Sequence, residues 1–175
     1  MVLTPVMEKF ILHWGEMGTR WGVNRSVSQI HALLFLAGRP VHAEEIAETL
    51  SMARSNVSTS LRELQGWGIV HQASVLGDRR DHFATTADVW EGFRLIMDER
   101  RKREIEPTIR MLRECADACR GGGEPEPVAK GVRTMLDFME TADAWYRQMR
   151  ALPTSTLKTV LKLGSKVTAL LPKSA

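Results

Sequence analysis

The residues whose chemistry is most suggestive lie in one predicted helix, from about Ala53 to Gln65. At 100° per residue, Val57, Leu61 and Leu64 share one face and would pack inward. The opposite face is small, polar and basic, with Arg54 near the helix start and then Ser55, Asn56, Ser58, Thr59 and Arg62. Short polar side chains let a helix enter a DNA major groove, where Arg pairs with guanine and Asn with adenine. The pattern indicates a DNA-reading helix, with Arg54 placed for a phosphate.

A short helix, from Glu44 to Leu50, is predicted immediately before the DNA-reading helix. Glu44 and Glu45 lie in its first turn, where carboxylates favour the positive end of the helix dipole. Ile46 and Leu50 are spaced to pack against the inner face of the following helix. This spacing predicts a helix-turn-helix. The pair alone is equally typical of two amphipathic helices in any α-helical protein.

A β-hairpin is predicted directly after these helices. Residues 69–76 are rich in β-forming residues, Gly77-Asp78 supplies a turn, and residues 79–85 can return as a second strand. Near its tip lie Arg79, Arg80 and His82. A hairpin that straddles the DNA backbone can place an Arg in the minor groove. The alternative is a solvated turn held by Asp–Arg pairs, which contribute little stability.

Longer helices are predicted from the 3.6-residue spacing of apolar residues at about 5–18, 26–38, 88–119 and 128–150. We expect Gly18 and Gly22 to break the first of them. Asp88 and Glu91 form a capping box at the start of the third. Pro107 lies inside that third helix, where it removes one backbone hydrogen bond, so we expect a kink there.

The predicted fold is mainly α with a small two-stranded β-wing, a winged helix-turn-helix with long dimerisation helices. The expected organisation is a dimerisation helix at 1–25, the winged helix-turn-helix DNA-binding domain at 26–87, C-terminal dimerisation helices at 88–153 and a basic amphipathic tail at 154–175. In the tail, a Lys stripe alternates with an apolar face. We expect this apolar face to dock on the folded body. Contact of the Lys with DNA phosphates or an anionic membrane, or a frayed end, are the alternatives.

Composition sets broad limits on the function. The 175 residues are 43% apolar and 26% charged, which permits a buried core, and the net charge of +3 does not by itself indicate a nucleic-acid partner. Neither a membrane-spanning run nor a signal peptide is predicted. The two Cys, Cys115 and Cys119, indicate a reduced, cytoplasmic protein. They share a helix face, so a redox switch and a pair of small buried thiols are both open interpretations.

Catalytic motifs are missing from the sequence. His13, His31, His42, His71 and His82 lack metal-ligand spacing, and there is neither a nucleophile motif nor a Gly-rich phosphate loop. We therefore expect no enzyme activity, no cofactor and no metal.

The run from Met52 to Val70 resembles the MarR superfamily, and in particular its GbsR-like branch. The segments 25–36, 77–83 and 103–107 support the resemblance, which covers about residues 5–150. The sequence departs from the family pattern at Ser51, where Gly is usual, and at 28–29 and 31–32 in the second helix. The segment after Pro153 has no counterpart. The resemblance implies a transcription regulator, and we expect a repressor, acting as a homodimer on a pseudo-palindromic operator.

The resemblance also implies a choline-like small-molecule effector. Aromatic faces can enclose a quaternary ammonium group, and the candidates are Trp14, Trp21, Trp90 and Phe93. Aromatic residues at helical spacing are more commonly core or interface residues. Two other functions remain open: a DNA-architectural protein without an effector, and a protein-interaction module on a winged-helix scaffold. Nucleoid association is expected for either DNA-binding function.

Overall fold

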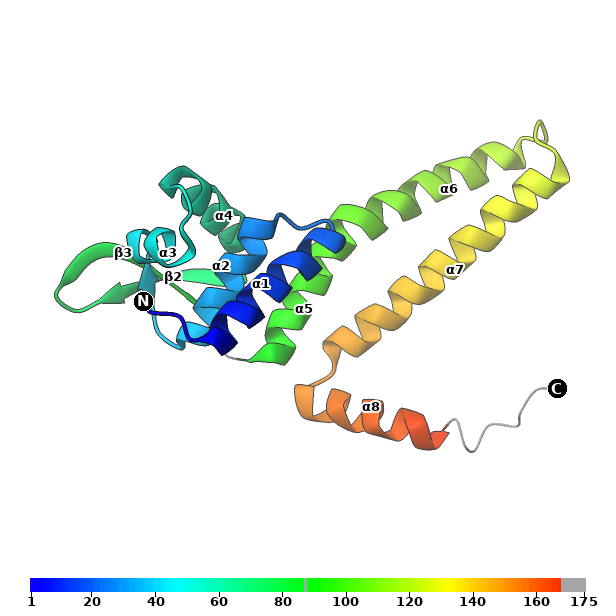
Figure 1. The fold of residues 1–175 in the computed structure, drawn as a ribbon. Coiled ribbons are helices and arrows are strands. Elements are labelled where there is room, and N and C mark those ends of the chain that lie inside the picture. Colours follow the sequence, from blue (N-terminus) through cyan, green and yellow to red (C-terminus); the bar gives the residue numbers. More distant parts are fainter. Residues whose placement is uncertain (87, 168–175) are drawn as a thin grey trace. The chain divides into compact units, whose positions relative to one another are not determined.

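The computed structural model describes residues 1–86 and 88–167, which fall into two compact units, residues 1–97 and 98–175 (Figure 1). The first unit contains α1 (Pro5–Arg20), α2 (Arg25–Ala37), β1 (Val41–His42), α3 (Ala43–Leu50), α4 (Arg54–Gly66), β2 (Val70–Val75) and β3 (Asp78–Thr85). Helix α5 (Val89–Arg100) begins in the first unit and ends in the second. The second unit continues with a π-helical turn (Arg101–Ile105), α6 (Glu106–Arg120), α7 (Glu126–Ala151) and α8 (Thr154–Val167).

The sheet of the first unit has three antiparallel strands in the order β1-β3-β2. The predicted hairpin is β2 and β3, in register from Val70 opposite Thr85. The added strand β1 pairs Val41 with Phe83. A two-residue strand has no alternation to detect, so the sequence predicted a two-stranded sheet. The predicted fold class, mainly α with a small β-wing, is confirmed.

The core of the first unit joins its helices and strands. The predicted inward residues of α2, among them Ile30 and Leu33, are fully buried, as are Ile46 of α3 and Val57 of α4. Burial of each such aliphatic side chain contributes roughly 1.5–3 kcal/mol. Leu95 and Ile96 of α5 also pack against this core. The core therefore holds α4 and the hairpin in one rigid arrangement.

Helix α1 packs against α2 through glycine. A Cβ on Gly18 would lie 1.9 Å from Oγ of Ser28, so only Gly fits this position. The helix continues past Gly18 to Arg20, so our expectation is wrong for Gly18, whereas Gly22, with φ of 75°, follows the end of the helix as expected. Close approach to a neighbouring helix, which the local sequence does not show, outweighs the low helix propensity of Gly.

The predicted long helix at 88–119 is interrupted before its proline. Asp88 caps its start, since its carboxylate accepts from the backbone N–H of Trp90 at 2.9 Å. The interruption is the π-helical turn Arg101–Ile105, and Pro107 lies in the first turn of α6. Pro107 lacks an N–H for the carbonyl four residues earlier. The wider π-helical turn before the proline accommodates the missing hydrogen bond. The helix is therefore irregular at residues 101–105, ahead of Pro107, where we expected the kink.

In the second unit, α6 and α7 form an antiparallel hairpin (Figure 1). Among its described residues, the buried apolar side chains are Ile109, Leu112, Ala116 and Ala129. Helix α8 covers tail residues 154–167, and its apolar residues Val160, Leu161 and Leu163 are exposed. Tail residues 168–175 lie outside the described residues, and docking of the tail remains a prediction. None of the described helices combines the length and apolar character needed to cross a membrane.

Candidate nucleic-acid interface

The turn between α3 and α4 fixes the angle at which α4 is presented. Ser51 takes a left-handed conformation with φ of 52°, and its N–H donates to the carbonyl of Glu48 at 3.3 Å. The N–H of Met52 donates to the carbonyl of Ala47 at 2.9 Å, which closes the end of α3. Ser51 thus adopts a left-handed backbone conformation that Gly would adopt at a lower energetic cost.

Helix α4 has the two faces that the sequence predicts. Val57, Leu61 and Leu64 are buried. All six predicted contact residues of the helix are exposed: Arg54, Ser55, Asn56, Ser58, Thr59 and Arg62. Nη2 of Arg62 lies 3.4 Å from the hydroxyl of Thr59, which is a weak contact, so the guanidinium retains its hydrogen-bonding capacity. The helix therefore presents a polar, donor-rich surface to solvent.

A polar cluster that the sequence analysis missed holds Asn56. The Ser26 hydroxyl lies 2.8 Å from Oδ1 of Asn24 and 2.9 Å from Oδ1 of Asn56. Ser60, one turn along α4, lies 3.4 Å from both Ser26 and Asn56. Ser26 and Ser60 are buried. The cluster joins the start of α2 to α4 and orients one end of the Asn56 amide. Ser60 lies four residues after Asn56, but Ser26 lies 30 residues away and gave no local signal.

The hairpin, or wing, carries its charged residues near the β2–β3 turn. Asp78 accepts from Nε of Arg80 at 2.9 Å and from its backbone N–H at 3.0 Å. Hydrogen bonds from the Arg80 side chain and backbone hold the pKa of Asp78 well below its usual range. Arg79 is exposed and has no carboxylate partner among the described residues. Arg79 is therefore the more available of the two arginines for a DNA contact.

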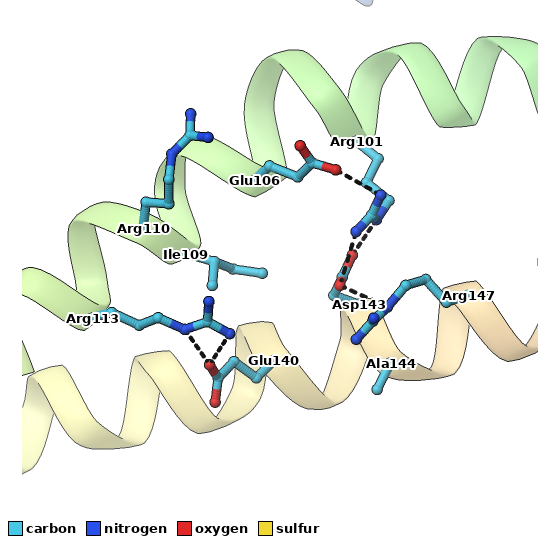
Figure 2. Close-up of a pocket in the computed structure, with 9 residues that line it drawn as sticks. All are labelled: Arg101, Glu106, Ile109, Arg110, Arg113, Glu140, Asp143, Ala144 and Arg147. Carbon is cyan, nitrogen blue, oxygen red and sulfur yellow. Dashed lines mark hydrogen bonds and ion pairs between the residues drawn. The ribbon is translucent and has the colours of Figure 1, made fainter.

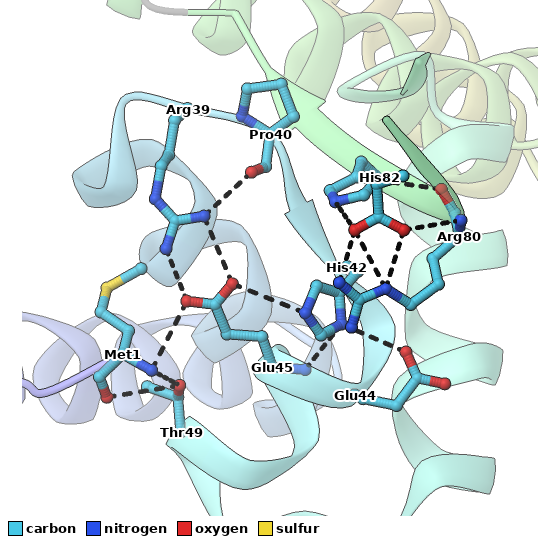
Figure 3. Close-up of polar contacts among 10 residues, drawn as sticks. Met1, Arg39, Pro40, His42, Glu44, Glu45, Thr49, Arg80 and His82 are labelled. Atoms are coloured by element: carbon cyan, nitrogen blue, oxygen red, sulfur yellow. Dashed lines mark hydrogen bonds and ion pairs between the residues drawn. The ribbon is translucent and has the colours of Figure 1, made fainter. Parts of the chain in front are cut away.

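His82 lies inside the base of the wing and is not on its surface. It is 5% exposed, and its ring packs edge-on against His42 with centroids 5.5 Å apart (Figure 3). Its Nδ1 donates to the carbonyl of Arg80 at 2.9 Å, and Nε2 lies 3.5 Å from Asp78. His42 in turn caps α3 by accepting from the N–H of Glu45. The geometry makes His82 a support that ties the wing to α3, and burial removes it from the predicted contact surface.

The predicted effector aromatics lie in α1, at its end and in α5. Trp14 is half-buried and stacks on Phe10 with ring centroids 5.4 Å apart. It also lies 6.4 Å from the ring of His31, whose pKa is lowered to about 4 by burial. Phe93 and Trp21 are more than half exposed, and Trp90 is half-buried. Trp14 is thus engaged in helix packing, and an aromatic cage remains a prediction.

The two predicted thiol residues are both half-buried in α6 and carry no disulfide. Sγ of Cys115 lies 3.6 Å from Sδ of Met111 on the preceding turn.

Comparison with known proteins agrees with this geometry. Residues 21–81, which run from the end of α1 into the wing, match the sequence model of the MarR family. The HTH-type transcriptional repressor GbsR of Bacillus subtilis (strain 168) is 22% identical over 140 residues, covering 77% of each chain. A solved structure described as a transcriptional regulator is 20% identical with a TM-score of 0.65, covering 83% of this chain and 96% of that one. MepR, a transcription regulator of the Staphylococcus aureus multidrug efflux pump MepA, is 11% identical with a TM-score of 0.39, covering 95% of this chain and 93% of that one.

Residues 21–81, which match the MarR family model, contain the helix-turn-helix and most of the wing. The predicted resemblance to the family and to its GbsR-like branch is confirmed. GbsR and the protein of that solved structure are both described as transcription regulators.

Proposed function

We propose that this chain is a transcription regulator that binds double-stranded DNA as a homodimer, with α4 in the major groove and the wing against the backbone. The observation that carries the proposal is the exposed polar and basic face of α4. Arg62, Thr59, Asn56 and Ser55 would face bases, whereas Arg54 and Arg79 would contact phosphate or the minor groove. The protein would act in the cytoplasm, on the nucleoid.

The homodimer is supported by an apolar row on α7. Val128, Met135, Phe138 and Trp145 are between 47% and 63% exposed, and they follow each other at intervals of seven, three and seven residues. This is the spacing of a coiled-coil seam, which requires a partner helix. A second copy of the same chain supplies an identical seam, and two-fold symmetry would present two α4 helices to one duplex.

The proposal also includes repression of transcription and control by a small-molecule effector. The GbsR relative is named a repressor, so we propose that binding to a pseudo-palindromic operator reduces transcription. A choline-like effector bound by the candidate aromatic residues Trp14, Trp21, Trp90 and Phe93 would modulate this binding. Titration of choline into the protein–operator complex, followed by fluorescence anisotropy, tests this part separately from DNA binding itself.

The experiment that tests the proposed function is selection from random duplexes followed by competition. A regulator should bind the selected duplex about 10³–10⁷ times more tightly than random DNA. An architectural protein would show little difference between the two, and an interaction module would bind neither. Either of these two results would reject the proposal.

A further inference from the structure

A pocket between α6 and α7, entirely within the second unit, has a chemistry that the proposed function does not use (Figure 2). Its volume is about 510 Å³, within the roughly 300–1,000 Å³ typical of small-molecule sites. It is lined by Arg101, Glu106, Ile109, Arg110, Arg113, Glu140, Asp143, Ala144 and Arg147. Seven of these nine side chains are charged, so the pocket suits a polar ligand and not an apolar one.

All three carboxylates of the pocket are already paired with arginine. Asp143, which is 8% exposed, accepts from Arg101 and lies 3.1 Å from Nε of Arg147. Glu106 accepts from Arg101 at 2.7 Å, and Glu140 accepts from Nε of Arg113 at 2.7 Å. The hydrogen bond from Arg101 lowers the pKa of Asp143 below the ordinary Asp value. A cation would have to displace an arginine from a paired carboxylate.

The arginines, in contrast, retain donors. Arg110 is one of the lining residues and has no carboxylate within ion-pair distance among the described residues. Its guanidinium points away from α7 in Figure 2, so a change of rotamer would bring it to a ligand held by Arg113 and Arg147. Arg147 pairs with Asp143 through Nε, which leaves the two terminal nitrogens of its guanidinium. Arg113 uses Nε and Nη2 on one oxygen of Glu140. Four guanidinium groups therefore face three carboxylates, and the unused hydrogen-bonding capacity consists mainly of donors.

We infer that this pocket binds a small polyanion, a molecule with two or more carboxylate or phosphate groups, through the free donors of Arg110, Arg113 and Arg147. Guanidinium groups bind both kinds of oxyanion through paired hydrogen bonds. The ligand would join α6 to α7, because Arg110 and Arg113 lie on α6 and Arg147 lies on α7.

The pocket is compatible with the proposed dimer and does not depend on it. On α7, at 3.6 residues per turn, Arg147 lies about 180° around the helix from Phe138 of the exposed apolar row. A partner helix packed on that row would leave the pocket-lining face of α7 with its own α6. The absence of anion binding and the absence of specific DNA binding would therefore be two separate results.

Isothermal titration of the full chain with citrate and with inorganic pyrophosphate tests the site, with acetate at matched ionic strength as the monoanion control. We expect saturable binding of at least one polyanion. Arg110→Ala and Arg147→Ala should each weaken it about tenfold, the loss expected for a charged hydrogen bond. Arg120→Ala is the matched control: it removes the same charge from α6, outside the pocket, at a side chain that is 81% exposed.

Binding of citrate alone would identify carboxylates as the ligand class, and binding of pyrophosphate alone would identify phosphates. Arg110 lacks an ion-pair partner among the described residues, so its replacement should leave the melting temperature unchanged. The inference is overturned if neither polyanion binds saturably. It is also overturned if Arg120→Ala weakens binding as much as the two pocket variants, because the attraction would then be general.

Discussion

The two units of this chain differ in the size of their apolar cores. In residues 1–97, a continuous cluster of aliphatic residues, among them Leu33 and Ile46, is buried. In the described part of residues 98–175, the buried apolar side chains are Ile109, Leu112, Ala116 and Ala129, whereas Phe138 and Trp145 of α7 are exposed. The first unit thus has a core of its own. The second exposes the apolar row that we propose a second copy of the chain covers.

The folding stability of the two units should therefore depend differently on protein concentration. The first unit has its hydrophobic core within one chain, so its folding should depend little on protein concentration. The second unit leaves an apolar row unburied, so its stability should rise with dimer formation. The predictions that follow test this contrast, beginning with the largest effect.

Phe138→Glu should convert the dimer to a monomer. A symmetric interface contains the side chain twice, so the loss is about 3–6 kcal/mol, at least a hundredfold in the dimer dissociation constant. Light scattering at micromolar concentration measures it. Arg133→Glu, at an exposed position about 140° around α7 from Phe138, is the control and should remain dimeric. A wild-type protein that is monomeric at this concentration would contradict the account of the second unit.

Leu33→Ala should destabilise the first unit by about 2–5 kcal/mol, because it opens a cavity at a fully buried position. Urea unfolding gives the value. Leu76→Ala removes the same atoms at the fully exposed wing tip and should change stability by no more than about 0.5 kcal/mol. Equal effects of the two substitutions would show that the core is not where the structure places it.

Arg62→Ala should weaken binding of the selected duplex by about 1–3 kcal/mol, mainly at one base position in each half-site. Arg54→Ala, on the same helix, should weaken binding of all sequences alike and reduce the salt slope by about one. Titrations against duplexes with single base changes distinguish the two arginines. If Arg62→Ala reduces affinity equally for selected and random DNA, Arg62 contacts phosphate and its assignment as a base reader is wrong.

Lowering the pH should destabilise the folded second unit, because it protonates Asp143. The pKa of Asp143 is lowered in the folded protein, chiefly by the hydrogen bond from Arg101. The stability it contributes is therefore present above the ordinary Asp value of 3.8 and is lost as the pH falls through the lower folded pKa. As the pH falls below the ordinary Asp value, the Asp143→Asn variant should lose less free energy of unfolding than the wild type. Urea unfolding between neutral pH and about pH 2 measures this loss. An unchanged acid profile would contradict this role.

The sequence predicted the elements whose signals are local. The alternation of buried and exposed residues in α4, and the turn residues Gly77-Asp78 between two β-rich runs, were sufficient for the helix-turn-helix and the wing. The sequence did not predict strand β1, because two residues are too few to show the alternating pattern of a β-strand. The continuation of α1 past Gly18 depends on Ser28 of another helix.

The parts of the sites that could not be predicted depend on contacts between distant residues. Arg101 and Asp143 are 42 residues apart, and Ser26 and Asn56 are 30 apart, so neither pair has a local pattern. His82 was assigned to the DNA surface from its position near the wing tip. Its burial follows from packing against His42, which lies on a strand that the sequence did not reveal.

Hydroxyl-radical footprinting on the selected duplex tests whether two copies of α4 read one DNA molecule. We expect two protected half-sites whose centres lie about 10–10.5 base pairs, or a small multiple of that distance, apart. Phe138→Glu should lose the paired protection at the same protein concentration. A single protected patch, or a paired footprint that Phe138→Glu leaves unchanged, would contradict it.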